Sequence, residues 1–292
     1  MRVLVTGGSG FIGAHLIRRL ARLEGHEVHA VSRHEQVSAH GERWHVADLA
    51  DAGAVTTLVD KVEPDAVLHL ASEVTGVRDV GQVVPVLQAN LLSVVNLLTA
   101  CAERKPRVVL AGSVEEPQHG ETPSSPYAAA KSAATGYARM FHALYQVPVT
   151  VLRLAMVYGP GQKDTRKLLP YVTLSLLHKE EPQLTNGTRL IDWIYVEDVV
   201  EAFVAAMGSD GAAGAVLDVG SGTQVSIRDT VELLVELADS DVRPQYGAVA
   251  ARPLDSAQVM RIEPTADAIG WRPQIDLAEG LRRTLHHYAN TV

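Results

Sequence analysis

Apolar and polar residues alternate along the chain in two ways, as short β-branched runs and as longer segments with helical periodicity. Over residues 1–157 the two kinds follow one another in turn, which is typical of a parallel sheet with helices on both faces. The pattern therefore predicts a doubly wound α/β fold. We expect strands over residues 2–6, 27–31, 43–47, 66–70, 107–112 and 149–157, and helices over 10–23, 51–62, 83–104 and 126–145.

The pattern becomes less regular beyond residue 158, where Gly and Pro gather at 158–161 and 182–188 as in loops that line a cleft. The change predicts a second, smaller domain. Its expected boundaries are 158–191 and 221–292, with residues of about 192–220 returning to a first domain that spans 1–157. Within this part we expect helices over 168–179 and 227–239 and a strand over 215–220.

Composition narrows the possible partners and location. The 292 residues carry a formal net charge of −8, so the chain lacks the basic field that gathers nucleic acid, and we expect no such partner. The single cysteine, Cys101, excludes an internal disulfide and is expected to be a small buried hydrophobe on a helix rather than a reactive thiol. A strand-like run follows Met1 without a secretory signal, and no stretch reaches about 18 unbroken apolar residues. We expect a cytoplasmic protein without a membrane span.

A glycine-rich turn follows the first expected strand. In TGGSGFIG, Gly7, Gly10 and Gly13 follow a strand at once and open an amphipathic helix. Such a backbone turns sharply, approaches a pyrophosphate closely and directs helix N–H groups at it, as in Rossmann-type dinucleotide-binding folds. The alternative is a glycine-rich turn without a ligand. We expect the cofactor to contact Gly7, Gly10, Phe11, Ile12 and Gly13.

The end of the second expected strand bears on which nicotinamide cofactor binds. An acidic residue is expected there for the ribose hydroxyls of NAD, but the chain has Ser32 followed by Arg33. A hydroxyl and a guanidinium donate hydrogen bonds to a 2′-phosphate that a carboxylate would repel. We therefore favour NADP(H), with NAD(H) as the alternative if Arg33 and His34 form only a solvated loop. Farther on, Asp48 and Leu49 are placed to meet the adenine, although Asp48 is equally suited to cap the next helix.

Ser113, Tyr127 and Lys131 form a candidate acid/base set. Tyr127 and Lys131 stand at i and i+4 in SPYAAAK, so on a helix both side chains project from one face. A phenol with an ordinary pKa of about 10 is a poor acid or base at neutral pH, and a nearby ammonium favours its ionised form. Ser113, just past the fifth expected strand, is placed to hydrogen-bond the same substrate oxygen. The set predicts hydride transfer to or from a nicotinamide while Tyr127 exchanges the hydroxyl proton.

These motifs together resemble the extended short-chain dehydrogenase/reductases, specifically the group of nucleotide-sugar epimerases, dehydratases and reductases. The resemblance runs almost end to end and implies an NAD(P)-binding Rossmann domain, a smaller C-terminal substrate-binding domain, and a homodimer that pairs the helices near 83–104 and 126–145. It implies catalytic roles for Ser113, Tyr127 and Lys131, and cofactor contacts at Leu70, Ala71, Ser72, Asn90, Tyr127 and Lys131. It rests on TGGSGFIG, LHLAS at 68–72, QANLLSVVNLL with Asn90, GSVEE at 112–116, SPYAAAK, RLAMVYGPGQ at 153–162, DWIYVEDV at 192–199, ARPLD at 251–255 and GWRP at 270–273.

Departures from the family pattern concern the substrate. Val114 stands where the family's dehydratases carry Asp, which argues against a 4,6-dehydratase. Met156 and Ile191 replace a common Asn and a common Arg; both are equally expected as core residues. Arg189 is placed to compensate for Ile191. Lys163, Arg166 and Lys167 form either an anionic-substrate rim or a solvated loop. The substrate-binding candidates are Glu115, Met156, Lys167, Arg189 and Arg252.

The leading hypothesis is a reductase that uses NADPH to reduce a keto group, at position 4, of a nucleotide-linked deoxysugar. A net reductase exchanges its cofactor at each turnover, which fits the Ser32 and Arg33 pair. The first alternative is a nucleotide-sugar 4-epimerase that keeps one NAD bound and uses the same three residues. The remote alternative is a non-enzymatic NADP-sensing module, since one fold hosts many roles. No metal site is expected.

Overall fold

The structure is a computed structural model that describes residues 1–74, 78–118, 120–250 and 258–291. The chain forms two compact units. The first comprises Met1–Leu154, Val200–Asp218 and Glu263–Trp271, and the second comprises Ala155–Val199, Val219–Ile262 and Arg272–Val292.

The first unit is built on a seven-stranded sheet with the strand order β10-β6-β5-β4-β1-β2-β3. Every pair from β6 across to β3 is parallel, which confirms the predicted Rossmann-type, doubly wound α/β fold. The strand order reverses between β1 and β4, the kind of switch point at which such sheets bind ligands. The strands are β1 (Arg2–Thr6), β2 (Glu27–Ser32), β3 (Arg43–Val46), β4 (Ala66–His69), β5 (Arg107–Ser113), β6 (Val149–Leu154) and β10 (Val216–Val219).

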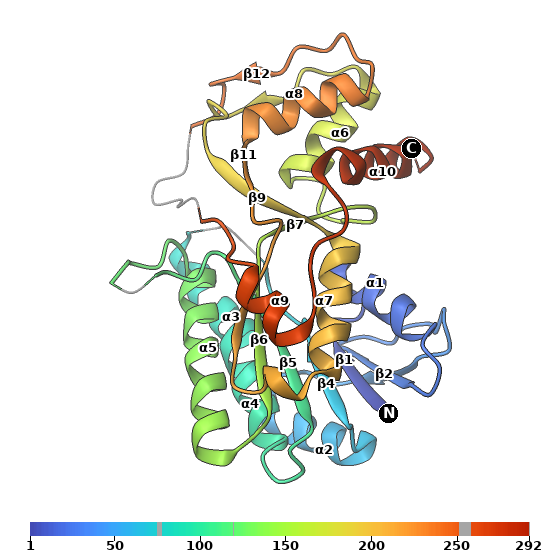
Figure 1. Cartoon of the computed structure of the whole chain (residues 1–292), viewed down its shortest axis with the longest axis vertical. Helices are drawn as coiled ribbons and strands as arrows, with labels where there is room; N and C mark the ends of the chain where they lie inside the picture. Colours follow the sequence, from blue (N-terminus) through green and yellow to red (C-terminus); the bar gives the residue numbers. More distant parts are fainter. Residues whose placement is uncertain (75–77, 119, 251–257, 292) are drawn as a thin grey trace. The chain divides into compact units, whose positions relative to one another are not determined.

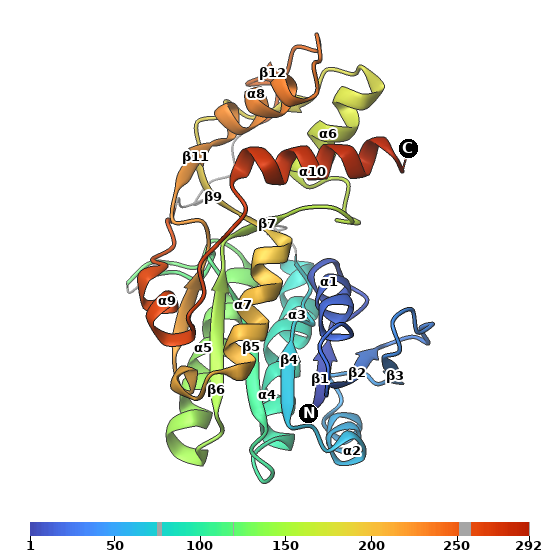
Figure 2. The ribbon, with the colours of Figure 1, turned by 45° about the vertical axis from the view of Figure 1, so that its right-hand side comes forward.

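Helices cover both faces of this sheet (Figure 1). On one face α2 (Ala52–Val62), α4 (Ser93–Ala100) and α5 (Pro126–Tyr145) bury an apolar cluster against β1, β4 and β5. Figure 2 shows α1 (Phe11–Leu20), α7 (Val196–Gly208) and α9 (Glu263–Ile269) along the other face. Cys101 belongs to the first cluster, and burial raises the pKa of its thiol to about 12, which suits the predicted inert role.

The expected single helix over 83–104 is more complex than its sequence suggests. It starts with a 3₁₀ turn, η1 (Val80–Gln82), continues as α3 (Val83–Leu87), passes through a π-helical segment, η2 (Gln88–Leu92), and ends with α4 at Ala100. Within the π segment the side-chain amide of Asn90 donates to the carbonyl oxygen of Val86 at 3.0 Å.

One helical stretch among the described residues, Val80–Ala100, has the length and composition of a membrane span, with a mean hydropathy of 1.7. The core helix of a soluble protein meets the same criteria. The sequence-based expectation missed this stretch because it considered only unbroken apolar runs. A few scattered polar residues interrupt the run but leave its mean hydropathy high. About a third of the most apolar window, 33%, is buried in one copy of the chain.

The second unit has its own sheets and core. A three-stranded sheet has the order β11 (Gln224–Ser226), β9 (Leu190–Tyr195) and β7 (Met156–Tyr158), and β12 (Gln245–Tyr246) pairs with β8 (Gln183–Leu184). Helices α6 (Leu168–His178), α8 (Ile227–Leu237) and α10 (Leu277–Ala289) enclose an apolar cluster with β9. The strand expected over 149–157 is therefore wrong in extent, since β6 and β7 belong to different sheets.

The compact units have other boundaries than those predicted from the sequence. Residues 263–271 lie in the first unit because α9 is bonded there: Thr265 donates to the carbonyl oxygen of Asp218 at 2.7 Å, and Ser209 donates to that of Ala268 at 2.9 Å. Residues 192–199 lie in the second unit because β9 pairs with β7 and β11. The assignment of cofactor binding to one unit and substrate binding to the other stays a prediction.

Candidate active site

The glycine turn connects β1 to α1 at the switch point of the sheet. Gly7 has a φ of +69°, and the N–H of Gly10 donates to the carbonyl oxygen of Gly7 at 2.9 Å. A Cβ on Gly13 would collide with that same carbonyl group, so the helix can start this close to the strand only with glycine there. The turn is therefore as tight as the spacing of its glycines predicts.

The first turn of α1 has the features of an anion site. Gly10 occupies the N-cap position without a side-chain hydrogen bond to the helix, and the first turn contains no acidic residue. The N–H groups of Phe11, Ile12 and Gly13 thus have neither an intrahelical acceptor nor a capping side chain in the way of a ligand. These residues fit a dinucleotide pyrophosphate.

The loop that follows β4 lies beside the glycine turn. The N–H of Leu70 donates to the carbonyl oxygen of Thr6 at 3.2 Å, and the N–H of Ala71 donates to the Thr6 hydroxyl at 3.1 Å. The buried Asn90 accepts from the Ser72 hydroxyl and donates to the carbonyl oxygen of Glu73 at 3.1 Å. The side-chain amide of Asn90 thus stabilises this loop through hydrogen bonds. The loop contains residues 70–72, which were predicted to contact the cofactor, and it lies against the glycine turn.

The ribose end of the expected site has no acidic residue at the end of β2. Ser32 ends the strand, its hydroxyl accepts from the N–H of His34 at 3.3 Å, and Arg33 is exposed. The following loop is closed by the buried carboxylate of Glu42, which accepts from the N–H groups of Ala39 and His40 at 3.0 and 2.8 Å. An exposed cation therefore stands at the start of an ordered loop.

Asp48 and Leu49 follow β3 as predicted, but the capping role considered for Asp48 is wrong. Asp51 is the N-cap of α2 and accepts from the N–H of Ala54 at 3.0 Å. Asp48 is exposed and accepts from the N–H of Ala50 at 3.0 Å, a contact within the loop that precedes the helix. Leu49 is buried in the core.

Ser113, Tyr127 and Lys131 come together at the carboxyl end of β5. Ser125 caps α5 by accepting from the N–H of Ala128 at 3.1 Å, and Pro126 fits the first helical turn, so the helix begins directly before Tyr127. Tyr127 hydrogen-bonds with Ser113 and Ser72. The ammonium of Lys131 lies 5.8 Å from the centre of the Tyr127 ring and donates to the carbonyl oxygen of Ala111 at 2.8 Å. All three side chains are buried.

Burial dominates the ionisation of this set. It raises the pKa of Tyr127, and Glu115 and Glu116 raise it further, while hydrogen bonding with Ser113 and Ser72 opposes the rise. Burial also lowers the pKa of Lys131 to about 8, against the attraction of Glu116. The sequence-based expectation that the Lys131 ammonium favours the phenolate of Tyr127 stays a prediction. At neutral pH Tyr127 is a protonated phenol beside a largely protonated amine.

Two groups that sequence reasoning missed lie next to these residues. His69 is 1% exposed; its Nδ1 is 2.9 Å from the Thr6 hydroxyl, and its Nε2 finds no hydrogen-bond partner among the described residues. Burial, helped by Lys131, lowers the pKa of His69 to about 3, so the ring is neutral. Glu116 is 4% exposed and contacts the Ser113 turn. The only signals in the sequence are their positions inside LHLAS and GSVEE.

The candidate substrate residues are divided between the units. Glu115 follows Ser113, whereas Met156, Lys167 and Arg189 belong to the second unit. Arg252 lies outside the described residues. Ile191 is a core residue of the second unit, and Met156 packs against the same cluster, which confirms the core interpretation of both. Arg166 is exposed and paired with Asp164 at 2.9 Å, as expected of a solvated loop.

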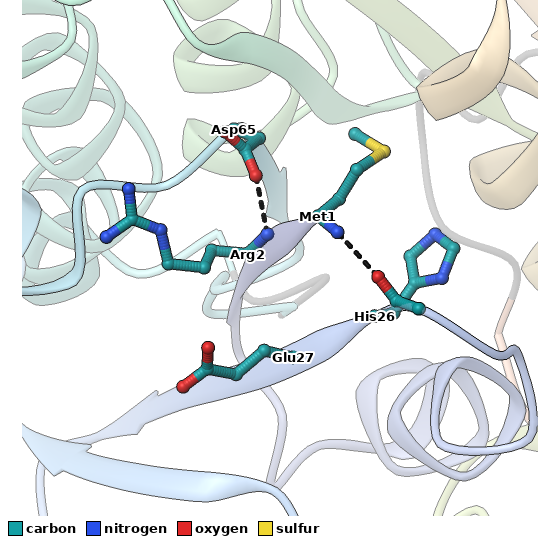
Figure 3. Close-up of a pocket in the computed structure, with 6 residues that line it drawn as sticks. Met1, Arg2, His26, Glu27 and Asp65 are labelled. Carbon is teal, nitrogen blue, oxygen red and sulfur yellow. Dashed lines mark hydrogen bonds between the residues drawn. The ribbon is translucent and has the colours of Figure 1, made fainter.

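A separate hollow lies at the amino ends of β1 and β2 (Figure 3). The amino group of Met1 donates to the carbonyl oxygen of Gly25, and the N–H of Arg2 donates to Asp65, both at 2.6 Å. The glycine turn follows the other end of β1. Because its polar groups bond one another, this hollow offers no argument for a ligand.

The chain is similar to known proteins over most of its length. The model of the NAD dependent epimerase/dehydratase family matches residues 3–220. UDP-glucose 4-epimerase of Mycolicibacterium smegmatis is 28% identical, with 99% of each chain covered. dTDP-glucose 4,6-dehydratase 1 of Escherichia coli is 29% identical, with 99% of this chain and 92% of the relative covered. The solved structure of the UDP-glucose 4-epimerase of Thermus thermophilus in complex with NAD is 29% identical, with 100% of both chains covered and a TM-score of 0.87.

Proposed function

Because the chain belongs to the NAD dependent epimerase/dehydratase family, we propose that it is a reductase that uses NADPH to reduce a keto group, at position 4, of a nucleotide-linked deoxysugar. The choice of cofactor rests on the residues at the end of β2. Ser32 and the exposed Arg33 stand there instead of a carboxylate, and together they suit a 2′-phosphate. NADP(H) is the cofactor of reductive chemistry, which is why this feature also favours reduction.

The glycine turn and the loop after β4 are the proposed cofactor cradle. The N–H groups at the start of α1 would bind the pyrophosphate, and Ala71 and Ser72, held by Thr6 and Asn90, would border the nicotinamide end. The bound cofactor supplies the hydride. The remaining steps of the reaction fall to the side chains of the chain itself.

Tyr127 is the proposed proton donor to the oxygen of the substrate carbonyl group. Its raised pKa keeps the phenol protonated at neutral pH, which suits a reduction because that reaction consumes a proton at the substrate oxygen. Ser113, already hydrogen-bonded with Tyr127, would share the same oxygen. Lys131, with a pKa of about 8, carries a positive charge near pH 7 and would stabilise the phenolate that remains after the proton has left.

A second candidate function is a nucleotide-sugar 4-epimerase with tightly bound NAD. Similarity over the whole chain to UDP-glucose 4-epimerases favours it, and one of these has a structure in complex with NAD. An epimerase would use the same three residues, but Tyr127 would first accept the hydroxyl proton of the sugar and then return it, and the hydride would return to the same sugar. Dehydration is less well supported, since Val114 occupies the place of the dehydratase Asp after Ser113.

A homodimer is the proposed assembly, in the cytoplasm. Val80, Val84 and Leu87 stand at i, i+4 and i+7 and are 85%, 61% and 44% exposed, and Tyr137 and Leu144 of α5 are 42% and 68% exposed. The helices α3 and α5 contact each other. A second copy pairing the same helices would cover them. Light scattering at twice the chain mass of 31.4 kDa would support the dimer, and the monomer mass would contradict it.

Turnover with a 4-keto sugar nucleotide tests the function. We expect purified protein to consume NADPH in stoichiometric amounts with such a substrate and to release the reduced sugar nucleotide. Protein that carries tightly bound NAD through purification, converts a nucleotide sugar to its 4-epimer and consumes no external cofactor would be an epimerase instead.

A further inference from the structure

The carboxylate of Glu116 lies directly behind the acid/base set and has no part in the chemistry described above. We propose that Glu116 is a positioning residue that ties the Ser113 turn to α5 and places a carboxylate on the face of that helix that carries Lys131. This inference rests on the proposed function of Ser113, Tyr127 and Lys131. It adds a fourth side chain on which their geometry and charge depend.

The two oxygens of Glu116 join two elements. Oε1 accepts from the backbone N–H of Ser113 at 2.8 Å, and Oε2 accepts from the hydroxyl of Thr135 at 2.7 Å. The N–H of Glu116 itself donates to the carbonyl oxygen of Ser113 at 3.1 Å, which closes the turn. Thr135 is on α5, so one buried side chain fixes the turn that carries Ser113 to the helix that carries Tyr127 and Lys131.

The partner on α5 is in line with the catalytic residues. Tyr127, Lys131 and Thr135 stand at i, i+4 and i+8 and therefore lie along one face of the helix. Space for the carboxylate comes from Gly112, where a Cβ would stand 2.7 Å from Oε1 of Glu116. The glycine directly before Ser113 thus admits the side chain that holds Ser113 in place.

Charge gives Glu116 a second effect. Lys131 and Glu116 attract each other, so Glu116 raises the pKa of Lys131 and Lys131 lowers that of Glu116. Burial is the largest influence on both groups: it lowers the pKa of Lys131 to about 8, and it leaves the pKa of Glu116 above its ordinary value although Ser113, Thr135, Arg153 and Lys131 lower it. The other groups in this electrostatic environment are His69, which is neutral, Tyr127, which is a protonated phenol, Glu115 beside the turn, and Arg153, which lowers the pKa of Glu116 and is paired with Asp218 at 2.6 Å.

The geometry and the charge can be separated by substitution. Glu116→Gln keeps the size of the side chain and an oxygen for one hydrogen bond but removes the charge. Thr135→Val removes the hydrogen bond to Glu116 and keeps the charge of Glu116. Thr135→Ser keeps both the hydrogen bond and the charge. A merely structural role would make the first two variants similar, whereas the proposed role makes only Glu116→Gln change the titration of Lys131.

The decisive readout is the titration of Lys131 by NMR in protein with ¹³C-labelled lysine, since the chain has only six lysines and Lys131→Met assigns the resonance. We expect the Lys131 midpoint to fall by about one pH unit in Glu116→Gln. It should stay near its wild-type position in Thr135→Val and Thr135→Ser. The same midpoint in Glu116→Gln and wild type would overturn the proposal.

A reciprocal experiment serves if Glu116→Gln fails to fold, as judged by circular dichroism. Coupling between two charges is mutual, so Lys131→Met must raise the pKa of Glu116, observed through ¹³C-labelled glutamate carboxyl groups. An unchanged titration of Glu116 would overturn the proposal. Neither titration needs a substrate, so a failure to reduce any sugar nucleotide would count against the proposed function and not against this coupling.

Discussion

The backbone of Ala71 lies so close to Gly7 that a Cβ at Gly7 would stand 2.6 Å from the Ala71 nitrogen. This contact joins the segments that follow β1 and β4, the two strands between which the sheet reverses its order. The backbone at Gly7 is also left-handed, with a φ of +69°, a conformation that favours glycine. The proposed pyrophosphate site is therefore fixed by backbone packing before a ligand binds.

Gly7→Ala tests this packing. Alanine in the left-handed conformation at position 7 is strained by about 1–2 kcal/mol, and the collision of its Cβ with Ala71 adds to this strain. We therefore expect Gly7→Ala to lower the free energy of unfolding. We also expect it to weaken NADPH binding by more than about tenfold. Urea unfolding and fluorescence titration measure the two effects. Gly208→Ala is the matched control, because a Cβ there meets nothing within 4 Å. Gly7→Ala protein with the stability and affinity of wild type would contradict the account of the turn.

Tyr127→Phe tests the acid/base assignment. The substitution removes only the hydroxyl that hydrogen-bonds with Ser113 and Ser72, and we expect kcat to fall by about 100-fold or more while NADPH still binds. Tyr137→Phe, at an exposed position of the same helix, should retain wild-type turnover. If Tyr127→Phe stays within a few-fold of wild type, another group supplies the proton.

Acid sensitivity is expected from Glu42, which closes the loop after β2. Burial alone would raise the pKa of Glu42, but hydrogen bonds from Ala39, His40, its own N–H and Trp44 outweigh burial and lower it from 4.5 to about 2. The folded-state pKa lies below the unfolded value, so the stability that Glu42 contributes is complete above pH 4.5 and is lost as the pH falls toward 2.

Glu42→Gln should therefore cost about 1–3 kcal/mol of unfolding free energy at pH 7, and the difference from wild type should shrink below pH 4.5. Urea unfolding at pH 7, 4.5 and 3 measures it. Glu35→Gln alters an exposed carboxylate in the same loop and serves as the control. A difference between Glu42→Gln and wild type that stays constant with pH would show that the charge is not what closes the loop.

The local features of the site were readable from the sequence. The glycine turn needs only a strand, three glycines and a helix in succession, and the Tyr127 and Lys131 pair needs only helical spacing after Ser125 and Pro126. Each of these signals lies within a few residues. For the same reason β1 and α5 begin and end at the residues that the pattern predicted.

Features that depend on contacts between distant segments were not readable. Glu116 meets Thr135 across 19 positions, and His69 meets Thr6 across 63, so no periodicity marks either pair. Most residues over 149–157 are apolar, so the pattern does not show that the chain changes from one sheet to another at Ala155. The N–H of Ala155 donates to the carbonyl oxygen of Val219. Burial of Tyr127 and Lys131 likewise follows from packing, and it is the largest cause of the raised pKa of Tyr127.

Fluorescence titration with the two reduced cofactors tests the central claim most directly. We expect the wild-type protein to bind NADPH at least about tenfold more tightly than NADH, and Arg33→Ala to lose that preference by weakening NADPH alone, since one charge-assisted contact is worth about 1.5–3 kcal/mol. Arg22→Ala, at an exposed position, should bind both cofactors as the wild type does. Equal or tighter binding of NADH by the wild type, or equal losses for both cofactors in Arg33→Ala, would contradict the assignment of an NADPH-dependent reductase.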